Sequence, residues 1–175
     1  KYVDRTIMVG TPNGGSLDAL RALVEGRDFG APIIPSHRWS LLGSFPSIYQ
    51  LLPRARFNSV VSSDTSKPID IMDPETWHRL GWGLAAPNVE SDLALLMPEI
   101  ADPAERRRIA LDFQSRALAS AKQFMAALDQ PATPPPNAEF MVVAGDAIQT
   151  EARMMVDPKS GALSVADTAP GDGLV

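Results

Sequence analysis

The chain has 175 residues, of which 45% are hydrophobic and 21% charged, and 21 acidic against 16 basic residues give a formal net charge of −5. A chain of this length can bury about 70% of the surface that it exposes when unfolded, so one domain with a sizeable core is expected. The negative charge disfavours nucleic acid as a partner, and the absence of cysteine excludes disulfides, a thiolate nucleophile and a cysteine zinc site.

The two histidines, His37 and His78, lie far apart in the sequence, and neither has a second histidine at the spacing of metal ligands on a helix. We therefore predict no metal and no cofactor. The sequence also lacks the run of about 18 apolar residues that a transmembrane helix needs and the basic-then-apolar layout of a signal peptide. The location in the cell stays open, with the lack of cysteine slightly favouring the cytoplasm.

The first predicted element is a buried strand at residues 3–9, which are mostly β-branched or apolar and are followed by Gly10. A helix is predicted to begin after Ser16, whose hydroxyl can cap the first amides, and to end at Gly26. Its apolar side is formed by Leu17, Leu20, Ala22, Leu23 and Val24.

The loop GTPNGGS connects this strand to this helix, and it has two interpretations. Gly10 and Gly15 have the separation of the two glycines in a phosphate-binding loop, but Ser16 stands where that loop requires lysine. We prefer a tight strand-to-helix turn, in which Gly14 and Gly15 supply the backbone freedom.

Residues 29–137 differ in character, with frequent prolines and short helical segments. Asp73-Pro74 and Asp102-Pro103 each place a capping aspartate before a first-turn proline, so each pair predicts the start of a helix, the second in the residue order of a capping box. The second helix extends to about residue 129, and we interpret its basic run, Arg106, Arg107 and Arg108, as a solvated face rather than an anion site. Its predicted apolar stripe consists of Ile109, Phe113, Ala117, Ala121, Phe124 and Leu128.

The proline-rich segment PATPPPN, residues 131–137, ends that helix, and a second buried strand is predicted at residues 139–144. Residues 151–157 and 162–167 flank Pro158-Lys159-Ser160-Gly161 and are predicted to form a β-hairpin with a glycine-containing turn.

The two buried strands enclose residues 16–138, far more than the dozen or so residues that a crossover between parallel strands needs. We therefore predict an α/β fold, a partial α/β-hydrolase core of parallel strands with a large helical cap insertion and a C-terminal β-hairpin. Its parts are a core strand with the glycine loop (1–15), a helical cap (16–137), and a second core strand with the hairpin and an acid loop (138–175).

Three stretches, in this order, resemble the lecithin:cholesterol acyltransferase family of α/β hydrolases: VDRTIMVGTPNGGS at residues 3–16, FPSIYQLLP at 45–53 and GDGLV at 171–175. The first is similar to the strand and glycine loop that follow the nucleophile region in that family. The second is similar to a segment of its cap, and the third to the GDGTV stretch that carries its catalytic aspartate. The resemblance implies a serine ester hydrolase or O-acyltransferase that acts on lipid or other acyl esters.

The resemblance also implies a Ser-Asp-His triad, of which this chain carries the acid, Asp172. No G-x-S-x-G pentapeptide occurs and no histidine follows Asp172, so we expect the serine before Lys1 and the histidine after Val175. Leu174 stands where the family has threonine. Asp146, just after the second strand, is the other candidate acid, but the glycines on both sides of Asp172 and the resemblance favour Asp172.

This interpretation predicts that the isolated chain hydrolyses no ester, and that its partners are an acyl ester or lipid substrate and the remaining parts of the hydrolase fold. Two alternatives stay open: a small module that binds an anion through the amides of GTPNGGS, and a helical interaction domain formed by the middle region. His78, beside a pair of tryptophans, is interpreted as a surface or packed residue without a catalytic role. An acyl pocket or an apolar cap core would equally explain Trp39, Phe45, Tyr49 and Leu51.

Overall fold

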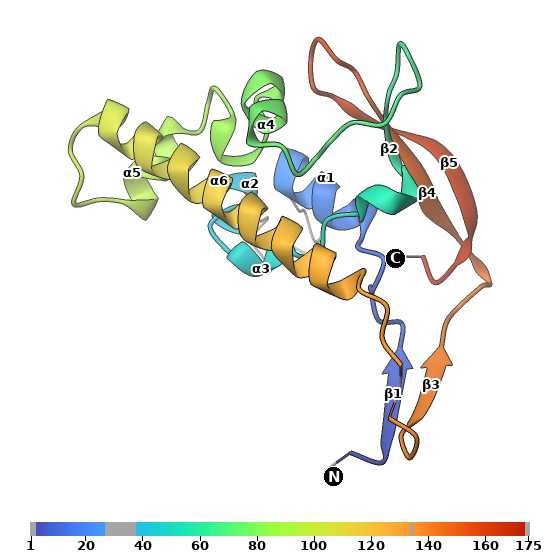
Figure 1. Cartoon of the computed structure of the whole chain (residues 1–175). Helices are drawn as coiled ribbons and strands as arrows, with labels where there is room; N and C mark the ends of the chain where they lie inside the picture. The colour runs from blue at the N-terminus through green and yellow to red at the C-terminus, as the bar shows by residue number, and fades with distance from the viewer. Residues whose placement is uncertain (1–2, 27–37, 134, 174–175) are drawn as a thin grey trace, which may run out of the picture.

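The computed structural model of the chain describes residues 3–26, 38–133 and 135–173, and it is of the α/β class, with two small sheets and a layer of helices (Figure 1). His37, Leu174 and both terminal residues lie outside the described residues. The elements are, in chain order, β1 (Arg5–Val9), α1 (Leu17–Glu25), α2 (Trp39–Leu42), α3 (Pro46–Tyr49), η1 (Ala55–Phe57), β2 (Val60–Ser62), α4 (Pro74–Leu80), η2 (Gly83–Ala85), α5 (Glu90–Leu96), α6 (Pro103–Leu128), β3 (Glu139–Val143), β4 (Ile148–Val156) and β5 (Leu163–Gly171).

The strands β1 and β3 pair in parallel, as predicted for the two strands at the ends of the helical region. Their register runs from Arg5 opposite Glu139 to Val9 opposite Val143, and the Arg5 and Glu139 side chains form an ion pair of 2.6 Å. The amide of Gly10 extends the ladder by donating to the carbonyl of Val143 at 2.9 Å. All the helices lie between these strands in the sequence, so they form the crossover that connects the pair.

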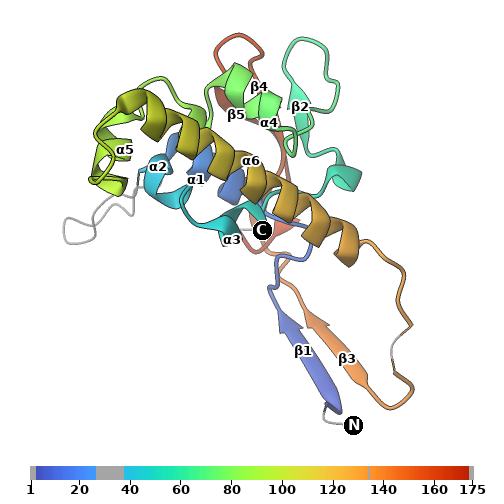
Figure 2. The same cartoon turned by 60° about the vertical axis from the view of Figure 1, so that its left-hand side comes forward.

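The prediction that these two strands are buried is wrong for this chain. Every residue of β3 is exposed, Val142 to 70%, and in β1 Val9 is 67% exposed. The helices pack on one another and on the second sheet, while the β1–β3 ribbon extends from one end of the helical layer (Figures 1 and 2). No described element covers either face of the ribbon.

The predicted hairpin is confirmed, and its strands β4 and β5 are longer than the sequence pattern indicates. In its turn Gly161 has a φ of +73°, and a methyl group at this position would lie 2.5 Å from the carbonyl oxygen of Leu80. The third strand of this sheet is β2, which comes from the middle of the chain and pairs in parallel with residues 154–156 of β4. The hairpin is therefore tied to the helical region through backbone hydrogen bonds.

Both proline-marked helix starts are confirmed. The Asp73 carboxylate accepts from the amide of Glu75 at 3.1 Å, and the Asp102 carboxylate accepts from the amide of Ala104 at 3.0 Å. Glu105, which a capping box would turn back to the start of α6, instead bonds the guanidinium of Arg108. Helix α1 begins after Ser16 as predicted, but that side chain makes no cap hydrogen bond to the helix.

The buried face of α6 is rotated from the predicted stripe. Of the predicted residues, Ala117 and Ala121 are buried, whereas Phe124 and Leu128 are 41% and 45% exposed. Small side chains let α6 pack closely on its neighbours, and the two larger side chains lie on the flank that faces the glycine loop. The buried residues of the helix are Arg106, Ala110, Gln114, Ala117, Leu118, Ala121 and Met125.

The main core joins the helical layer to the hairpin. The rings of Trp77 and Trp82 pack edge to face with centroids 5.6 Å apart. The indole N–H of Trp77 donates to the carbonyl of Ile71, and that of Trp82 to the carbonyl of Gly161 in the hairpin turn, each at 2.8 Å. None of the helices in the described part of the chain combines the length and apolar character that crossing a membrane requires.

Candidate active site

The glycine loop forms a tight turn, and the backbone of residues 51–52 packs against it. Gly15 has a φ of +85°, and a Cβ at this position would overlap the carbonyl of Leu52, so only glycine fits. Gly14 has no positive φ, so of the two glycines expected to supply backbone freedom only Gly15 does so through φ. The amide of Ser16 donates to the carbonyl of Leu51 at 2.7 Å.

Three further amides of this loop donate to carbonyls within the protein. Gly10 donates to Val143, Asn13 to Thr11, and Gly15 to Pro12, all through backbone carbonyls at 2.8–2.9 Å. A loop that cradles phosphate needs its amides directed at the ligand. The anion-binding alternative therefore lacks the donors it needs at these positions.

Asp172 lies at the carboxyl ends of the two parallel strands, between the glycines that follow them. A methyl group on Gly10, just after β1, would lie 3.6 Å from Oδ2 of Asp172. A methyl group on Gly145, just beyond β3, would lie 2.9 Å from Cβ of Asp172. Asp172 is half-buried and forms a parallel β-bridge with Ile148. The hairpin thus returns the chain to the strand end from which it departs.

Asp146, the competing carboxylate, is exposed and lies next to Gly145 in sequence. Both aspartates are thus near the end of β3, but Asp172 is the one in contact with Gly145 and close to Gly10. Among the described residues, no three histidine, cysteine, aspartate or glutamate side chains gather as ligands for a metal ion.

A largely apolar pocket of about 190 Å³ opens beside the glycine loop. Residues 11–13 and 15 of the loop form one wall, and Leu51, Phe124 and Leu128 contribute apolar side chains from the helical layer. Arg54, 5% exposed, also lines it, and its guanidinium donates to the carbonyl of Asn13 at 2.9 Å. The pocket therefore lies between the helices and the loop that contacts the Asp172 region.

The other aromatic candidates for an acyl pocket lie elsewhere. Tyr49 is fully buried in the main core, where its hydroxyl donates to the carbonyl of Gly43 at 3.0 Å and burial raises its pKa well above the usual range. Trp39 packs against the smaller core cluster, and Phe45 is exposed. Of the four residues considered, only Leu51 lines the pocket beside the glycine loop.

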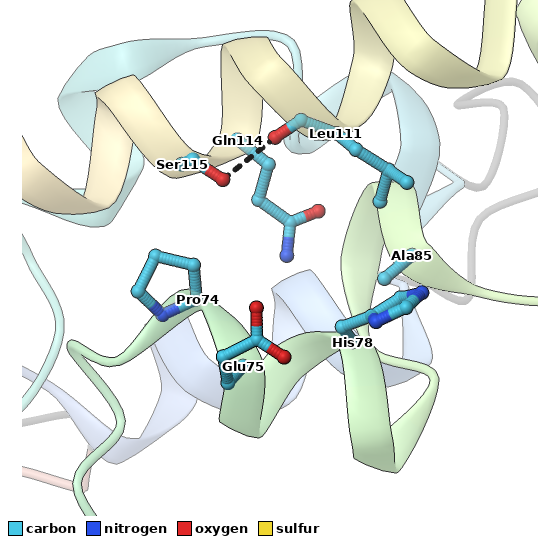
Figure 3. A pocket seen from close by; sticks show the side chains of 7 residues that line it. All are labelled: Pro74, Glu75, His78, Ala85, Leu111, Gln114 and Ser115. Atoms are coloured by element: carbon cyan, nitrogen blue, oxygen red, sulfur yellow. Dashed lines mark hydrogen bonds between the residues drawn. The ribbon is translucent and has the colours of Figure 1, made fainter.

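His78 lines a separate pocket between α4 and α6 (Figure 3). Glu75 and His78 come from α4, and Gln114 and Ser115 from α6, where the Ser115 hydroxyl donates to the carbonyl of Leu111 at 2.9 Å. His78 is exposed, and neither the glycine loop nor Asp172 contributes to the lining. The structure thus places His78 at the surface of the helical layer.

The basic run of α6 has partners within the protein. Arg106 is buried and pairs with Glu90, Arg107 donates to the carbonyls of Ala85 and Ala86, and Arg108 pairs with Glu105. Of the three arginines, Arg108 alone is exposed. The interpretation of a solvated face is wrong for Arg106, which is buried and connects α6 to α5 through its ion pair with Glu90. The run presents no cluster of unpaired guanidinium groups.

The first 80 residues of this α/β protein match the family model described as lecithin:cholesterol acyltransferase. The matched region includes β1, the glycine loop and FPSIYQLLP, so two of the three stretches that carry the resemblance lie within it. Residues 1–80 are thus similar to this family, which confirms the resemblance over that part of the chain. At the level of the family, it implies acyltransferase- or esterase-type chemistry on lipids. A search of curated proteins finds no match.

Proposed function

We propose that this chain is the part of a serine esterase or O-acyltransferase that carries the acid of its Ser-Asp-His triad, and that Asp172 is this acid. Its substrates are lipid or other acyl esters. The observation that carries the proposal is the position of Asp172 at the carboxyl ends of two parallel strands, the edge where open α/β sheets bind their ligands.

In this proposal the Asp172 carboxylate accepts a hydrogen bond from the ring N–H of a histidine. It thereby holds the imidazole in the tautomer that takes the proton of a serine hydroxyl, and it stabilises the imidazolium that forms. The serine attacks the ester carbonyl, the alcohol leaves with the proton from the histidine, and the acyl group passes to water or to a second alcohol. The serine and the histidine are supplied by other parts of the hydrolase fold.

Those other parts also explain the exposure of β1 and β3. The ribbon exposes apolar side chains on both faces, and its outer edges are open among the described residues, as expected for two inner strands of a larger sheet. Strands paired at these edges and helices on both faces would bury Ile7, Val9, Phe140 and Val142.

The pocket beside the glycine loop is the proposed site for the acyl chain. Its apolar walls include Leu51, Phe124 and Leu128, and the loop that forms another wall begins at Gly10, close to Asp172. In this proposal Phe124 and Leu128 are exposed because they line the site that binds the acyl chain.

The test compares Asp172→Asn and Asp146→Asn in the intact enzyme. Removal of a triad acid lowers kcat by up to about 10⁴-fold, so Asp172→Asn is expected to lose activity on this scale with an unchanged melting temperature. Asp146→Asn should lose much less. Equal activity of Asp172→Asn and wild type, or a greater loss in Asp146→Asn, would overturn the assignment.

The isolated chain supplies a second test. Because it holds no serine elbow, it should not hydrolyse a p-nitrophenyl ester above the buffer rate, and phosphate should not shift its melting temperature. Turnover that survives rigorous purification would contradict the triad proposal, and a phosphate-dependent shift would favour the anion-binding alternative.

A further inference from the structure

Thr150 of β4 packs against the backbone of the acid loop, which consists of residues 171–173. It is 8% exposed, and its hydroxyl accepts a hydrogen bond from the amide of Gly173 at 2.7 Å. The same hydroxyl donates to the carbonyl of Ile148 at 3.2 Å. A hydroxyl can make both bonds because it carries one donor and two acceptor sites. This side chain therefore links the backbone that precedes it to the backbone that follows Asp172.

The residue before Asp172 contacts the same hydroxyl. A Cβ on Gly171 would overlap Oγ1 of Thr150, so the chain passes against the oxygen at this point. Both sequence neighbours of Asp172 are thus fixed by one buried side chain.

The acid loop needs such support because glycine backbones have many accessible conformations. Gly173 has a φ of +88°, which glycine adopts readily. Because glycine also adopts many other conformations, its own backbone preference does not hold the loop in one position. Without the threonine hydroxyl, the amide of Gly173 would lose its protein partner, and the loop could move so that water takes its place. A displacement of about 1 Å in a catalytic group can lower a rate about 10²-fold.

We propose that Thr150 is a positioning residue, which holds the Asp172 carboxylate in place through the amide of Gly173. The inference rests on the proposed role of Asp172 as the triad acid. It adds a residue that lies 22 positions earlier in the chain, in a strand with no sequence motif of its own.

The first test uses Thr150→Val, which keeps the shape and removes the hydroxyl, and Thr150→Ser, which keeps the hydroxyl. In the intact enzyme, Thr150→Val is expected to lower kcat about 10- to 100-fold with little change in KM, and Thr150→Ser to restore most of it. Thr168→Val, an exposed position on β5, is the matched control and should be neutral.

The second test asks whether Thr150 acts through Asp172. In an Asp172→Asn background, Thr150→Val should cause no further loss, because the group it positions is already inactive. A full additional loss in the double variant would overturn the proposal. Thr150→Val should also shift the acid limb of the kcat/KM profile in the same direction as Asp172→Asn, which a general loss of stability would not do.

The third measurement needs no activity. Hydrogen exchange in the chain itself should show the Gly173 amide protected in wild type and Thr150→Ser, and exposed in Thr150→Val. If Thr150→Val fails to fold, Thr150→Ala compared with Thr150→Ser gives the same contrast. Loss of activity in Asp172→Asn but not in Thr150→Val refutes this inference alone, whereas full activity in Asp172→Asn refutes the proposed function.

Discussion

Gly145 and Asp172 are in contact across the end of β3: a methyl group on Gly145 would lie 2.9 Å from Cβ and 3.2 Å from Cα of Asp172. Real Cβ atoms do not approach other atoms this closely, so a side chain at residue 145 and the present position of Asp172 exclude each other. The glycine thus determines where the carboxylate can lie.

Gly145→Ala should therefore displace the acid loop. We expect at least about a tenfold loss of kcat in the intact enzyme, because the added methyl group forces Asp172 away from the strand end. Gly14→Ala is the matched control, since its methyl group meets only the ring of Phe57, an exposed side chain that can move, at 3.2 Å. Equal kcat values for the two variants would show that the acid loop tolerates the displacement.

Phe124→Ala should weaken binding of long acyl chains. The ring lines the proposed acyl pocket while remaining partly exposed, so its removal loses about 1 kcal/mol of apolar contact and raises KM for a long-chain ester about fivefold. KM for an acetyl ester should not change. The control is Leu95→Ala, a side chain that is 80% exposed and does not line that pocket. The same change in KM for both esters would argue against an acyl site here.

Arg54→Ala should destabilise the chain. The Arg54 guanidinium pairs with Asp129 and donates to the carbonyl of Asn13 at 2.9 Å. Loss of the buried charge and its bonds should cost about 2 kcal/mol, measured by urea unfolding. Arg56→Ala is the control, because Arg56 is an exposed partner of the same carboxylate and should contribute less than about 1 kcal/mol. Equal losses in the two variants would contradict the role given to burial.

Acid should weaken the hairpin turn through Asp157. Its side chain accepts from the amide of Lys159 at 2.8 Å, and this bond in particular lowers the pKa of Asp157 below its ordinary value of 3.8. A carboxyl with a lowered pKa stabilises the fold above its ordinary pKa, and the stabilisation disappears as the pH falls through the folded-state value. Asp157→Asn should thus lower the melting temperature at pH 7, and the difference from wild type should shrink below pH 3.8. A difference that stays constant from pH 7 to pH 2 would contradict this.

The sequence predicted the elements that depend on local signals. The strand before GTPNGGS, the helix starts at Asp73 and Asp102, and the hairpin around Gly161 all follow from capping residues, alternation or turn residues nearby. Asp172 was predicted as the acid from its neighbouring glycines and the resemblance. Its position at the strand ends is consistent with that choice.

The parts that the sequence did not predict depend on contacts between distant residues. Nothing near Thr150 indicates that it supports a loop 22 residues later. Arg54 likewise has no motif, and its burial depends on the end of α6 and the glycine loop meeting in space. The burial of β1 and β3 was predicted from their apolar composition, which describes a strand's preferred surroundings rather than those present in this chain.

The parallel pairing of β2 with β4 has a consequence for how the protein opens. Regions of a protein unfold locally in cooperative units that share backbone pairing and core contacts. Val60–Ser62 pairs with the half of β4 that enters the main core, and the other half of the same strand carries Thr150. Fluctuations that detach the helical layer should therefore release the acid loop as well. Slow hydrogen exchange at residues 60–62 and at Gly173 would then occur in the same opening event.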